Sequence, residues 1–377
     1  MELEELREQI NGIDEEILSL FTRRMSLAGQ VARYKQEHGL PIFQQERERQ
    51  ILRRVGEKAG EFSGSAQVLF TTLMDVSKSY QRQILAHMDR SELRRRIEAA
   101  VAAGRRVPEE ADVACAGVPG AYAHEAVLAL FKRPALRFCE RFDGVFAAVA
   151  GGEADFGVVP IENSIAGSVD AVYDLLRQYK LTICGSYKLP VDHCLLACSG
   201  ADAGAITDVY SHEQAISQCS QFLSGHPGIR AHVDTTTAAA AKRVAEMNSP
   251  RAAAIASRAC AEYYGLRIVR EGLQNVRPNF TRFLVISKEL IIPPDANKIS
   301  LSLTLPHETG SLGRILTRFS SLSLNLTKLE SRPRPDTDFE FRFYFDFDGS
   351  VREDAVRDLI CSLEEETGQF EFLGNYT

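Results

Sequence analysis

The amino-acid sequence predicts a multidomain chain with three fold classes: an all-α helical domain, a two-lobed α/β domain and an α+β domain of ferredoxin-like (βαββαβ) order. Apolar residues recur at helical spacing in the first 90 positions. From Val113, short apolar runs alternate with amphipathic segments, as is typical of an α/β domain. After Pro293-Pro294 the pattern reads strand, helix, strand, strand, helix, strand. A chain of 377 residues is long enough for several cores.

The composition is that of an ordinary globular protein, with 45% hydrophobic and 25% charged residues. A formal net charge of -7 offers no general attraction to nucleic acid or to an anionic membrane, so we expect neither as a partner. Met1 to Arg7 are too charged for a signal peptide, and no apolar run is long enough to span a bilayer, which predicts a cytoplasmic protein. The eight cysteines show no C-x-x-C spacing, so we expect reduced core residues and no metal site.

A long first helix is predicted over residues 3 to 34. Its heptad stripe consists of Leu3, Leu6, Ile10, Ile13, Ile17, Leu20, Leu27 and Val31. Arg24 stands in this stripe where an apolar residue is due, and Lys35 lies about three turns further on, near the same face. A buried cation requires either a carboxylate from another helix or a bound anion.

Two further helices are predicted before residue 90. After Pro41, one helical stripe carries an amide, a cation, a carboxylate and an apolar residue: Gln44, Arg47, Glu48 and Ile51. The third helix begins near Ser63, runs past residue 85 and has the apolar face Leu69, Leu73, Val76, Tyr80 and Ile84, with Ser77 and Gln81 at its edge. Three helices with polar groups facing one interior describe a cavity for a polar anion. A helical dimerisation module with salt bridges explains the same periodicity equally well.

Residues 1–90 resemble the all-helical chorismate mutase family in Leu6-Arg7, Arg23-Arg24, Lys35, Gln45-Glu46-Arg47-Glu48 and Ser77-x-x-x-Gln81. By this resemblance the residues in contact with chorismate are Arg7, Arg24, Lys35, Gln44, Arg47, Glu48, Ser77 and Gln81. The two arginines Arg7 and Arg24 would hold carboxylates, and Lys35 and Gln81 would be the catalytic donors to the ether oxygen. Gln44 and Glu48 would meet the ring hydroxyl, although the family often has Asp at the position of Gln44. A Claisen rearrangement requires no nucleophile and no cofactor.

The spacing of two arginines predicts a homodimer or a higher homo-oligomer. Arg7 and Arg24 are about 25 Å apart along one helix, at about 1.5 Å per residue. They cannot grip one small dianion from the same chain. If both serve one site, Arg7 must reach into the pocket of a second subunit.

Residues 91–112 are predicted to be a linker. The Arg94-Arg95-Arg96 run, an alanine-rich stretch and Gly104-Arg105-Arg106 read as the end of a helix followed by a solvated connection. No aromatic residues are interleaved with the basic run, so a solvated face explains it better than a nucleic-acid site.

The α/β domain is predicted over residues 113–287, with one lobe at 113–188 plus 275–286 and a second at 189–270. A cleft between lobes suits a small molecule. The stretch Glu162-Asn163-Ser164 follows a strand and suits an anion, and Ser211, Gln214 and Gln218 fall at i, i+3 and i+7. The Thr235-Thr236-Thr237 run precedes an alanine-rich helix and is expected to cap it.

A hydroxyl and a cation stand together where another strand begins. Thr281 and Arg282 precede the apolar run Leu284-Val285-Ile286, and we expect both to reach one ligand at the strand start, where the pleat is not yet regular. Arg282 would grip a carboxylate, while Thr281 would donate a hydrogen bond to a leaving oxygen.

These stretches resemble the prephenate dehydratase family in Gly117-x-Pro119-Gly120, Glu162-Asn163-Ser164-x-x-Gly167-Ser168-Val169, Tyr210-Ser211-His212 and Thr281-Arg282-Phe283. The resemblance assigns Asn163, Ser211, Gln218, Thr281 and Arg282 to the prephenate site, beside Ser164. Its reaction removes a carboxylate and a hydroxyl from opposite ends of a cyclohexadiene ring, and aromatisation drives it. Thr281 would be a positioned donor, since a Thr hydroxyl is a very weak acid. Glu162 and a water both stay open as the proton source.

Residues 296–377 carry two motifs, Gly310-Ser311-Leu312 and Glu330-Ser331-Arg332-Pro333, that resemble amino-acid-binding regulatory (ACT) domains. The effector-binding residues implied are Gly310, Ser311, Leu312, Glu330 and Ser331. Glu330 would meet an ammonium group, and Gly310 at a helix start would let the backbone approach a carboxylate.

Together the resemblances identify a bifunctional chorismate mutase and prephenate dehydratase that takes chorismate through prephenate to phenylpyruvate, with L-phenylalanine as allosteric effector and no cofactor. A non-catalytic, amino-acid-responsive binding protein is the alternative from another class, and retention of both polar sets argues against it. An enzyme with an active dehydratase and purely structural helices is intermediate.

Overall fold

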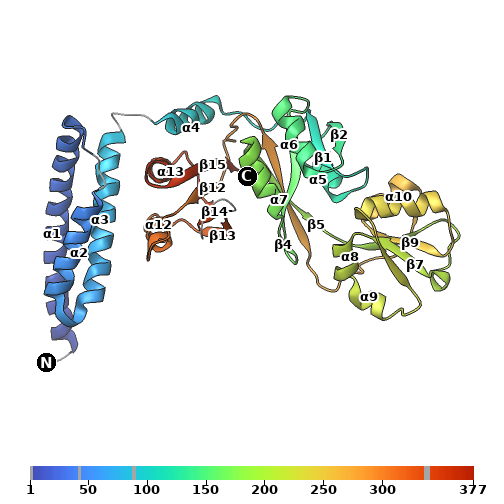
Figure 1. Ribbon diagram of the computed structural model, residues 1–377, viewed down its shortest axis with the longest axis horizontal. Coiled ribbons are helices and arrows are strands. Elements are labelled where there is room, and N and C mark those ends of the chain that lie inside the picture. The colour runs from blue at the N-terminus through green and yellow to red at the C-terminus, as the bar shows by residue number, and fades with distance from the viewer. Residues whose placement is uncertain (1–2, 41–43, 87–90, 335–339) are drawn as a thin grey trace.

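The computed structural model describes residues 3–40, 44–86, 91–334 and 340–377. Pro41, the end of the predicted helical domain at 87–90 and residue 339, the first residue of a strand predicted at 339–347, lie outside this range. Within it, no helix combines the length and the apolar character that a membrane crossing requires. Figure 1 shows the N-terminal helices and the second α/β lobe at opposite ends of the molecule.

Three helices form the N-terminal domain, as predicted: α1 (Leu3–Glu37), α2 (Gln45–Ala59) and α3 (Ser63–Ala86), with a 3-10 turn at Gly60–Phe62. Both α1 and α2 pack on α3 (Figure 1). Small residues let α1 approach closely, because Ala28, Gly29 and Ala32 are its buried positions. A Cβ on Gly29 would lie 3.1 Å from Ile84.

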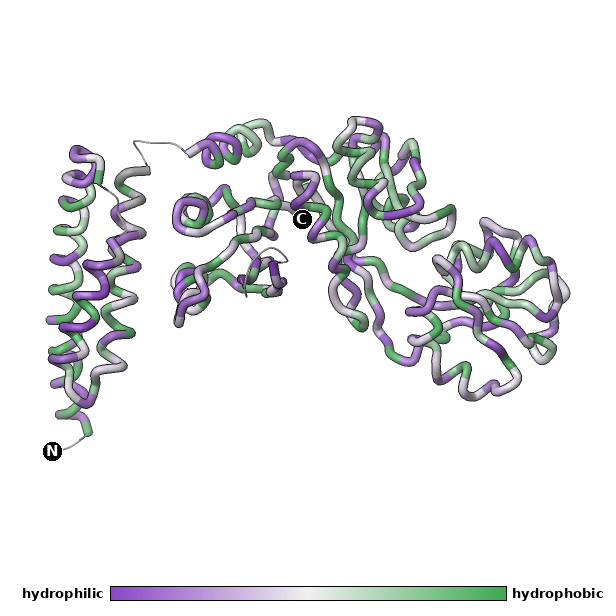
Figure 2. The backbone as a smooth tube through the Cα atoms, in the orientation of Figure 1, coloured by the Kyte–Doolittle hydropathy of each residue, from purple (hydrophilic) through white to green (hydrophobic). Residues whose placement is uncertain are grey.

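The heptad stripe of α1 is not buried within the described chain. All of its members, from Leu3 to Val31, are exposed. Figure 2 shows hydrophobic and hydrophilic residues alternating along this helix. Eight apolar side chains on one helix face exceed the scattered apolar exposure of ordinary surfaces. This helix therefore packs on α3 with one face and offers a second, apolar face to the outside.

The predicted linker contains a helix, as expected, but this helix is packed against the C-terminal domain and is not simply solvated. Residues 92–103 form a separate helix, α4 (Glu92–Ala103), capped by Ser91, whose hydroxyl accepts from the backbone N–H of Arg94 at 3.1 Å. Leu93 and Ile97 are buried in the core of the C-terminal domain. Arg94 is buried as well and pairs with Asp358. The basic run thus begins with a structural ion pair.

The first α/β lobe is built on a sheet of order β2-β1-β3-β11-β5, with the short β4 paired to β3. Its strands are β1 (Asp112–Ala116), β2 (Ala135–Cys139), β3 (Phe156–Asn163), β4 (Gly167–Ser168), β5 (Thr182–Pro190) and β11 (Phe280–Ser287). Its helices are α5 (Tyr122–Leu130), α6 (Phe142–Gly151) and α7 (Asp170–Tyr179). The late strand β11 returns between β3 and β5, antiparallel to both, which confirms the predicted two-part lobe.

The second lobe has a sheet of order β10-β6-β9-β7-β8. Its strands are β6 (Cys194–Ala197), β7 (Asp208–Ser211), β8 (Arg230–Val233), β9 (Ala252–Ala256) and β10 (Arg267–Arg270). Its helices are α8 (Glu213–Gln218), α9 (Ser220–Ser224), α10 (Thr237–Met247) and α11 (Arg258–Tyr264), with a 3-10 turn at Ala203–Ala205. The five residues of β9 are fully buried, so this strand is the centre of the lobe.

The C-terminal domain follows the order β12 (Lys298–Thr304), α12 (Ser311–Ser321), β13 (Leu326–Pro333), β14 (Phe341–Asp348), α13 (Asp354–Glu366) and β15 (Gly368–Tyr376). Its antiparallel sheet has the order β13-β14-β12-β15. Side chains of α12 and α13 join those of α4 in one core on this sheet.

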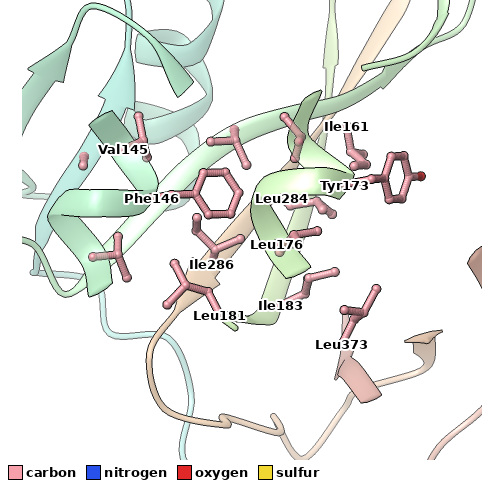
Figure 3. Packing of buried hydrophobic residues seen from close by; sticks show 14 of the residues in the cluster. Val145, Phe146, Ile161, Tyr173, Leu176, Leu181, Ile183, Leu284, Ile286 and Leu373 are labelled. Carbon is pink, nitrogen blue, oxygen red and sulfur yellow. The ribbon is translucent and has the colours of Figure 1, made fainter. Parts of the chain in front are cut away.

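The C-terminal domain also shares a core with the first lobe. Tyr344, Leu373 and Tyr376 are buried in one cluster with apolar side chains of β3, α6, α7 and β11. Figure 3 shows Leu373 beside Ile183 and Leu176. The sheet of this domain is therefore covered by helices on one face and by the α/β lobe on the other.

The burial of α4 predicts a local stability effect. Ile97→Ala removes a fully buried side chain, and such changes cost about 2–5 kcal/mol. The helix should open more often, so trypsin should cut the chain faster at Arg95 and Arg96. Gel electrophoresis measures this cutting rate. Glu92→Ala, at an exposed position of the same helix, is the matched control. Equal cutting rates in wild type and both variants would support the original interpretation of this segment as a solvated linker.

Candidate functional site

The interior of the helical domain gathers polar side chains from α1 and α3. Arg24 donates to the carbonyl oxygen of Leu73 at 2.8 Å and to the hydroxyl of Ser77. Burial lowers the pKa of Arg24. Gln81 is also buried, and its Oε1 has no hydrogen-bond partner within the described residues. A buried amide oxygen without a partner is costly, which favours a ligand here.

Lys35, the second predicted cation, feels the charge of a carboxylate on α2. Burial lowers the pKa of Lys35, while the charge of Glu48 acts in the opposite direction. Glu48 also pairs with Lys78 at 2.9 Å, and Lys78 pairs with Asp75 at 2.9 Å. Lys78 was not among the sequence-predicted residues. It connects α2 to α3 next to the polar interior.

Three of the predicted chorismate contacts lie outside this interior in the single chain. Arg7 is exposed and pairs with Glu4 at 3.3 Å in its own helix. Gln44 and Arg47 are exposed at the start of α2. The structure thus brings together Arg24, Lys35, Glu48, Ser77 and Gln81 and leaves Arg7, Gln44 and Arg47 apart.

A cavity of about 970 Å³ lies between the two lobes of the α/β domain. The first lobe contributes Asn163, Ser168 and Thr281, and the second contributes Gln214, Gln218 and the Thr235-Thr236-Thr237 run. Thr236 caps α10, as predicted, because its hydroxyl accepts from the backbone N–H of Ala239 at 3.0 Å. Residues from β3, β11, α8 and the start of α10 therefore converge on one space.

The side chains of Asn163 and Thr281 are fixed to each other across β3 and β11. Thr281 pairs with Asn163 in the ladder, and the Nδ2 of Asn163 donates to the Thr281 hydroxyl oxygen at 3.0 Å. The Oδ1 of Asn163 accepts from the backbone N–H groups of Ile165 and Ala166 at 3.0 and 2.9 Å. Since Thr281 is the acceptor of this bond, its own proton is left for a ligand in the cavity.

Gln218 reaches the cavity with partners that the sequence analysis missed. Its Oε1 lies 3.0 Å from the Nε2 of His193 and accepts from the Nδ2 of Asn279 at 3.2 Å. The Nδ1 of His193 lies 3.0 Å from the hydroxyl of Tyr122. A lone histidine between two predicted strands gives almost no signal in one sequence. Asn279 lies two residues before Thr281 in the sequence, and this was the only signal that could have indicated a role for Asn279 in the site.

Two predicted hydroxyls serve the backbone. Ser211 is fully buried and donates to the carbonyl oxygen of Ile255 at 2.6 Å, which ties β7 to β9. Ser164 accepts from the backbone N–H of Phe280 at 2.9 Å and holds the β3–β4 turn against β11. Neither side chain lines the cavity in this structure.

The expectation that Thr281 and Arg282 share one ligand is not met. The pairing of β11 with β5 is regular at these residues, and the irregularity in its pairing with β3 comes after Arg282. The side chains of Thr281 and Arg282 therefore point to opposite faces, and Arg282 turns away from the cavity. Its guanidinium lies 2.5 Å from Asp346 and 2.7 Å from Glu162. Burial opposes this charge, but Asp346 and Glu162 outweigh it and raise the pKa of Arg282.

Glu162 is likewise committed to ion pairs outside the cavity. Its carboxylate pairs with Arg282 and, at 3.1 Å, with Lys328 of β13. It does not line the cavity. This geometry argues against Glu162 as the proton source of a reaction at Thr281.

The predicted effector residues fall on two sides of the C-terminal domain. The carboxylate of Glu330 pairs with Lys328 at 3.2 Å and accepts from Ser168 at 2.5 Å, so it faces the α/β lobe. Ser331 follows it in β13 and points to the other face. Gly310, with φ of 84°, begins α12, where Ser311 is buried and Leu312 half-buried. Glu330 is therefore not a free carboxylate for an ammonium group in this structure.

Comparison with known proteins covers both catalytic regions. A model of the chorismate mutase type II family matches residues 6–82, and a model of the prephenate dehydratase family matches residues 113–290. A solved prephenate dehydratase from Arthrobacter aurescens in complex with L-Phe matches with a TM-score of 0.65 at 28% identity, over 71% of this chain and 90% of that one.

Two curated relatives match along nearly their whole length. The bifunctional chorismate mutase/prephenate dehydratase of Escherichia coli K12 is 32% identical over 381 residues, which cover 98% of this chain and 95% of that protein. The protein of the same name from Aquifex aeolicus is 32% identical over 377 residues, which cover 100% and 98%. With both domains matched in one continuous alignment, the chain belongs to the family of bifunctional chorismate mutase/prephenate dehydratases.

Proposed function

We propose that the helical domain converts chorismate to prephenate and that the cavity between the lobes converts prephenate to phenylpyruvate. The observation that carries the second assignment is the bond from Asn163 to Thr281, which leaves a hydroxyl proton facing the cavity. Incubation with chorismate, with separate measurement of chorismate loss and phenylpyruvate formation, tests both steps. Chorismate loss without phenylpyruvate would leave only the mutase, and conversion of added prephenate alone would leave only the dehydratase.

The mutase step requires charge stabilisation and a fixed substrate conformation. Carbon-oxygen cleavage and carbon-carbon formation occur within one molecule, so no group is transferred to the protein. Lys35 and Gln81 donate to the ether oxygen as negative charge develops there, and Arg24 binds a carboxylate. Burial lowers the pKa of Lys35, and the charge of Glu48 opposes this effect and so favours the charged form of Lys35.

The dehydratase step expels carbon dioxide and hydroxide. The electron pair of the broken carbon-carboxylate bond enters the ring, which becomes aromatic as the carbon-oxygen bond at the far end breaks. Thr281 donates a hydrogen bond to the departing oxygen, and Asn163 keeps the Thr281 hydroxyl in the donor orientation. Gln218 offers a second donor on the opposite lobe.

Removing the Thr281 hydroxyl separates the two activities. Thr281→Val keeps the side-chain shape, so phenylpyruvate formation from prephenate should fall by about 100-fold or more through loss of one oriented donor. Chorismate mutase activity of the same preparation should be unchanged. Thr317→Val, on the exposed face of α12, is the matched control. Near-normal turnover of prephenate by the Thr281 variant would remove this hydroxyl from the mechanism.

We infer that a second copy of the chain completes the mutase site. The exposed heptad stripe of α1 is apolar over its whole length, and α1 carries Arg7 outside the interior that holds Arg24. A two-fold dimer with paired α1 helices buries the stripe and brings Arg7 of each chain toward the pocket of the other. The partner is therefore identical, and each site takes residues from both chains.

Hybrid dimers test the shared site. Arg7→Ala and Lys35→Ala homodimers should each lose mutase activity, because every site lacks one cation. Random co-assembly makes half of the dimers hybrid with one of two sites intact, so about a quarter of wild-type activity should return after co-expression. Chorismate loss is the measurement, and mass spectrometry verifies the hybrids. Verified hybrids as inactive as both parents would show that Arg7 does not act across an interface.

We propose that residues 296–377 are an ACT-type regulatory domain that binds L-phenylalanine and inhibits the dehydratase. The βαββαβ order, the Gly310 turn and the Glu330-Ser331-Arg332-Pro333 motif support this proposal. The salt bridges of Lys328 and Asp346 with residues of β3 and β11 give the domain a direct mechanical connection to the Thr281 strand. A chain cut after residue 290 would expose the shared core, so a point variant is the better test.

Substitution at the α12 start should weaken regulation and spare catalysis. Gly310→Ala adds a methyl group where a ligand carboxylate would approach the backbone and strains a residue at φ of 84°. The phenylalanine concentration for half-inhibition should rise about tenfold or more, since coupling requires binding at a second site. Gly313→Ala, in the same helix with open space around it, is the control. Unchanged inhibition of the Gly310 variant would place the effector elsewhere.

A further inference from the structure

A continuous chain of hydrogen bonds runs beside the dehydratase cavity, from β3 of the first lobe to Gln218 of the second lobe and back to Tyr122 of the first. Its members are Asn163, Asn279, Gln218, His193 and Tyr122, with Thr281 as a branch at Asn163. The family resemblance assigns Asn163, Gln218 and Thr281 to the site. It gives no role to His193.

The direction of the bonds from Asn163 to His193 follows from two backbone groups. The N–H groups of Ile165 and Ala166 can only donate, so the atom of Asn163 that faces them is its oxygen. The amide nitrogen of Asn163 therefore faces the other way. It donates to the Oδ1 of Asn279 at 2.8 Å and to the Thr281 hydroxyl.

The donor and acceptor atoms at His193 follow from the same argument. Since Asn279 uses its oxygen toward Asn163, its Nδ2 donates to the Oε1 of Gln218 at 3.2 Å. An oxygen also faces the Nε2 of His193, at 3.0 Å, so that nitrogen carries a proton. In the neutral imidazole the Nδ1 is then an acceptor. It lies 3.0 Å from the Tyr122 hydroxyl, whose single proton also faces the backbone carbonyl oxygen of Asp192 at 3.1 Å.

We propose that His193 is a positioning residue of the dehydratase, which holds the Gln218 oxygen together with Asn279 so that the Gln218 NH₂ group donates to the anionic substrate. Gln218 and His193 both line the cavity, and within the described residues the Nε2 of Gln218 has no hydrogen-bond acceptor. Both ring nitrogens of His193 are occupied, so the ring acts through Gln218 and not on the substrate. This inference rests on the proposed dehydratase function.

The surroundings of His193 favour a fixed ring. The side chain is 3% exposed, and its backbone N–H donates to Gln274 at 3.1 Å. Burial lowers the pKa of His193, while the bond to Gln218 and the charge of Asp192 act in the opposite direction. The titratable or charged groups nearby are Tyr122 and Asp192, the latter 3.7 Å from Arg277. Both protonation states keep the Nε2–H, so the bond to Gln218 is independent of pH.

Three substitutions test this role with prephenate as the substrate of the full-length enzyme. His193→Phe keeps the ring and removes the donor, so kcat/KM should fall by about 100-fold as the Gln218 amide loses its orientation. His193→Gln restores an N–H near the Nε2 position and should recover most of the loss with a wild-type pH profile. His226→Phe changes an exposed histidine of the same lobe and should match wild type.

A double-mutant cycle separates positioning from a general packing effect. Gln218→Met removes the amide, so adding His193→Phe to it should cost little more, because the ring acts only through that amide. Multiplicative losses in the double variant would overturn the proposal, as would full activity of His193→Phe. Equal inactivity of His193→Gln and His193→Phe would indicate proton transfer by the ring instead. Wild-type enzyme that forms no phenylpyruvate would contradict the dehydratase function itself, not the role of His193.

Discussion

The alternation of side chains along β11 determines how the α/β domain works. Consecutive residues of a strand face opposite sides, and in β11 one side is the cavity while the other is the C-terminal domain. Thr281 and Phe283 therefore line the cavity, and Arg282 lies between Asp346 and Glu162. Because β11 runs between β3 and β5 and pairs with both, neither face can shift without the other.

Burial of a guanidinium makes this arrangement a strong constraint. A buried charge without its partner costs several kcal/mol, so Arg282 requires Asp346 and Glu162 in place. Asp346 in turn accepts from Ser300 at 2.6 Å, and Ser300 meets the hydroxyl of Tyr376 at 2.6 Å. The C-terminal sheet is thus connected through β12, β14 and β15 to the strand that carries Thr281. A displacement of that sheet would therefore act on the cavity wall directly, through the contact of Asp346 with Arg282 in β11, and would not require movement of a distant hinge.

Sequence reasoning recovered the elements that have clear periodicity and missed those that depend on orientation. The three N-terminal helices and the βαββαβ order follow from local patterns, whereas the family resemblance placed Asn163 and Thr281 in one site. The position of Arg282 was not predicted. An irregular strand start was assumed, which would have allowed Thr281 and Arg282 to face the same side of β11. For α4, the i, i+4 pair Leu93 and Ile97 was the missed signal beneath an obvious basic run. His193 could not be found, because its importance lies in a chain of contacts between residues distant in sequence.

Both sites face the same physical problem, since neither reaction uses a protein nucleophile. The transition state must be stabilised by hydrogen-bond donors that are already oriented before the substrate binds. Reorienting the donors during the reaction would cost the free energy that they contribute. In the dehydratase, the backbone of the β3–β4 turn fixes the orientation of the Asn163 amide. The Asn163 amide in turn fixes the orientation of the Asn279 amide. In the mutase, Arg24 is oriented by Leu73 and Ser77 of α3, while Arg7 is exposed and pairs with Glu4 of its own helix. The dehydratase cavity is therefore preorganised by one chain, whereas full preorganisation of the mutase pocket depends on what packs against the apolar face of α1.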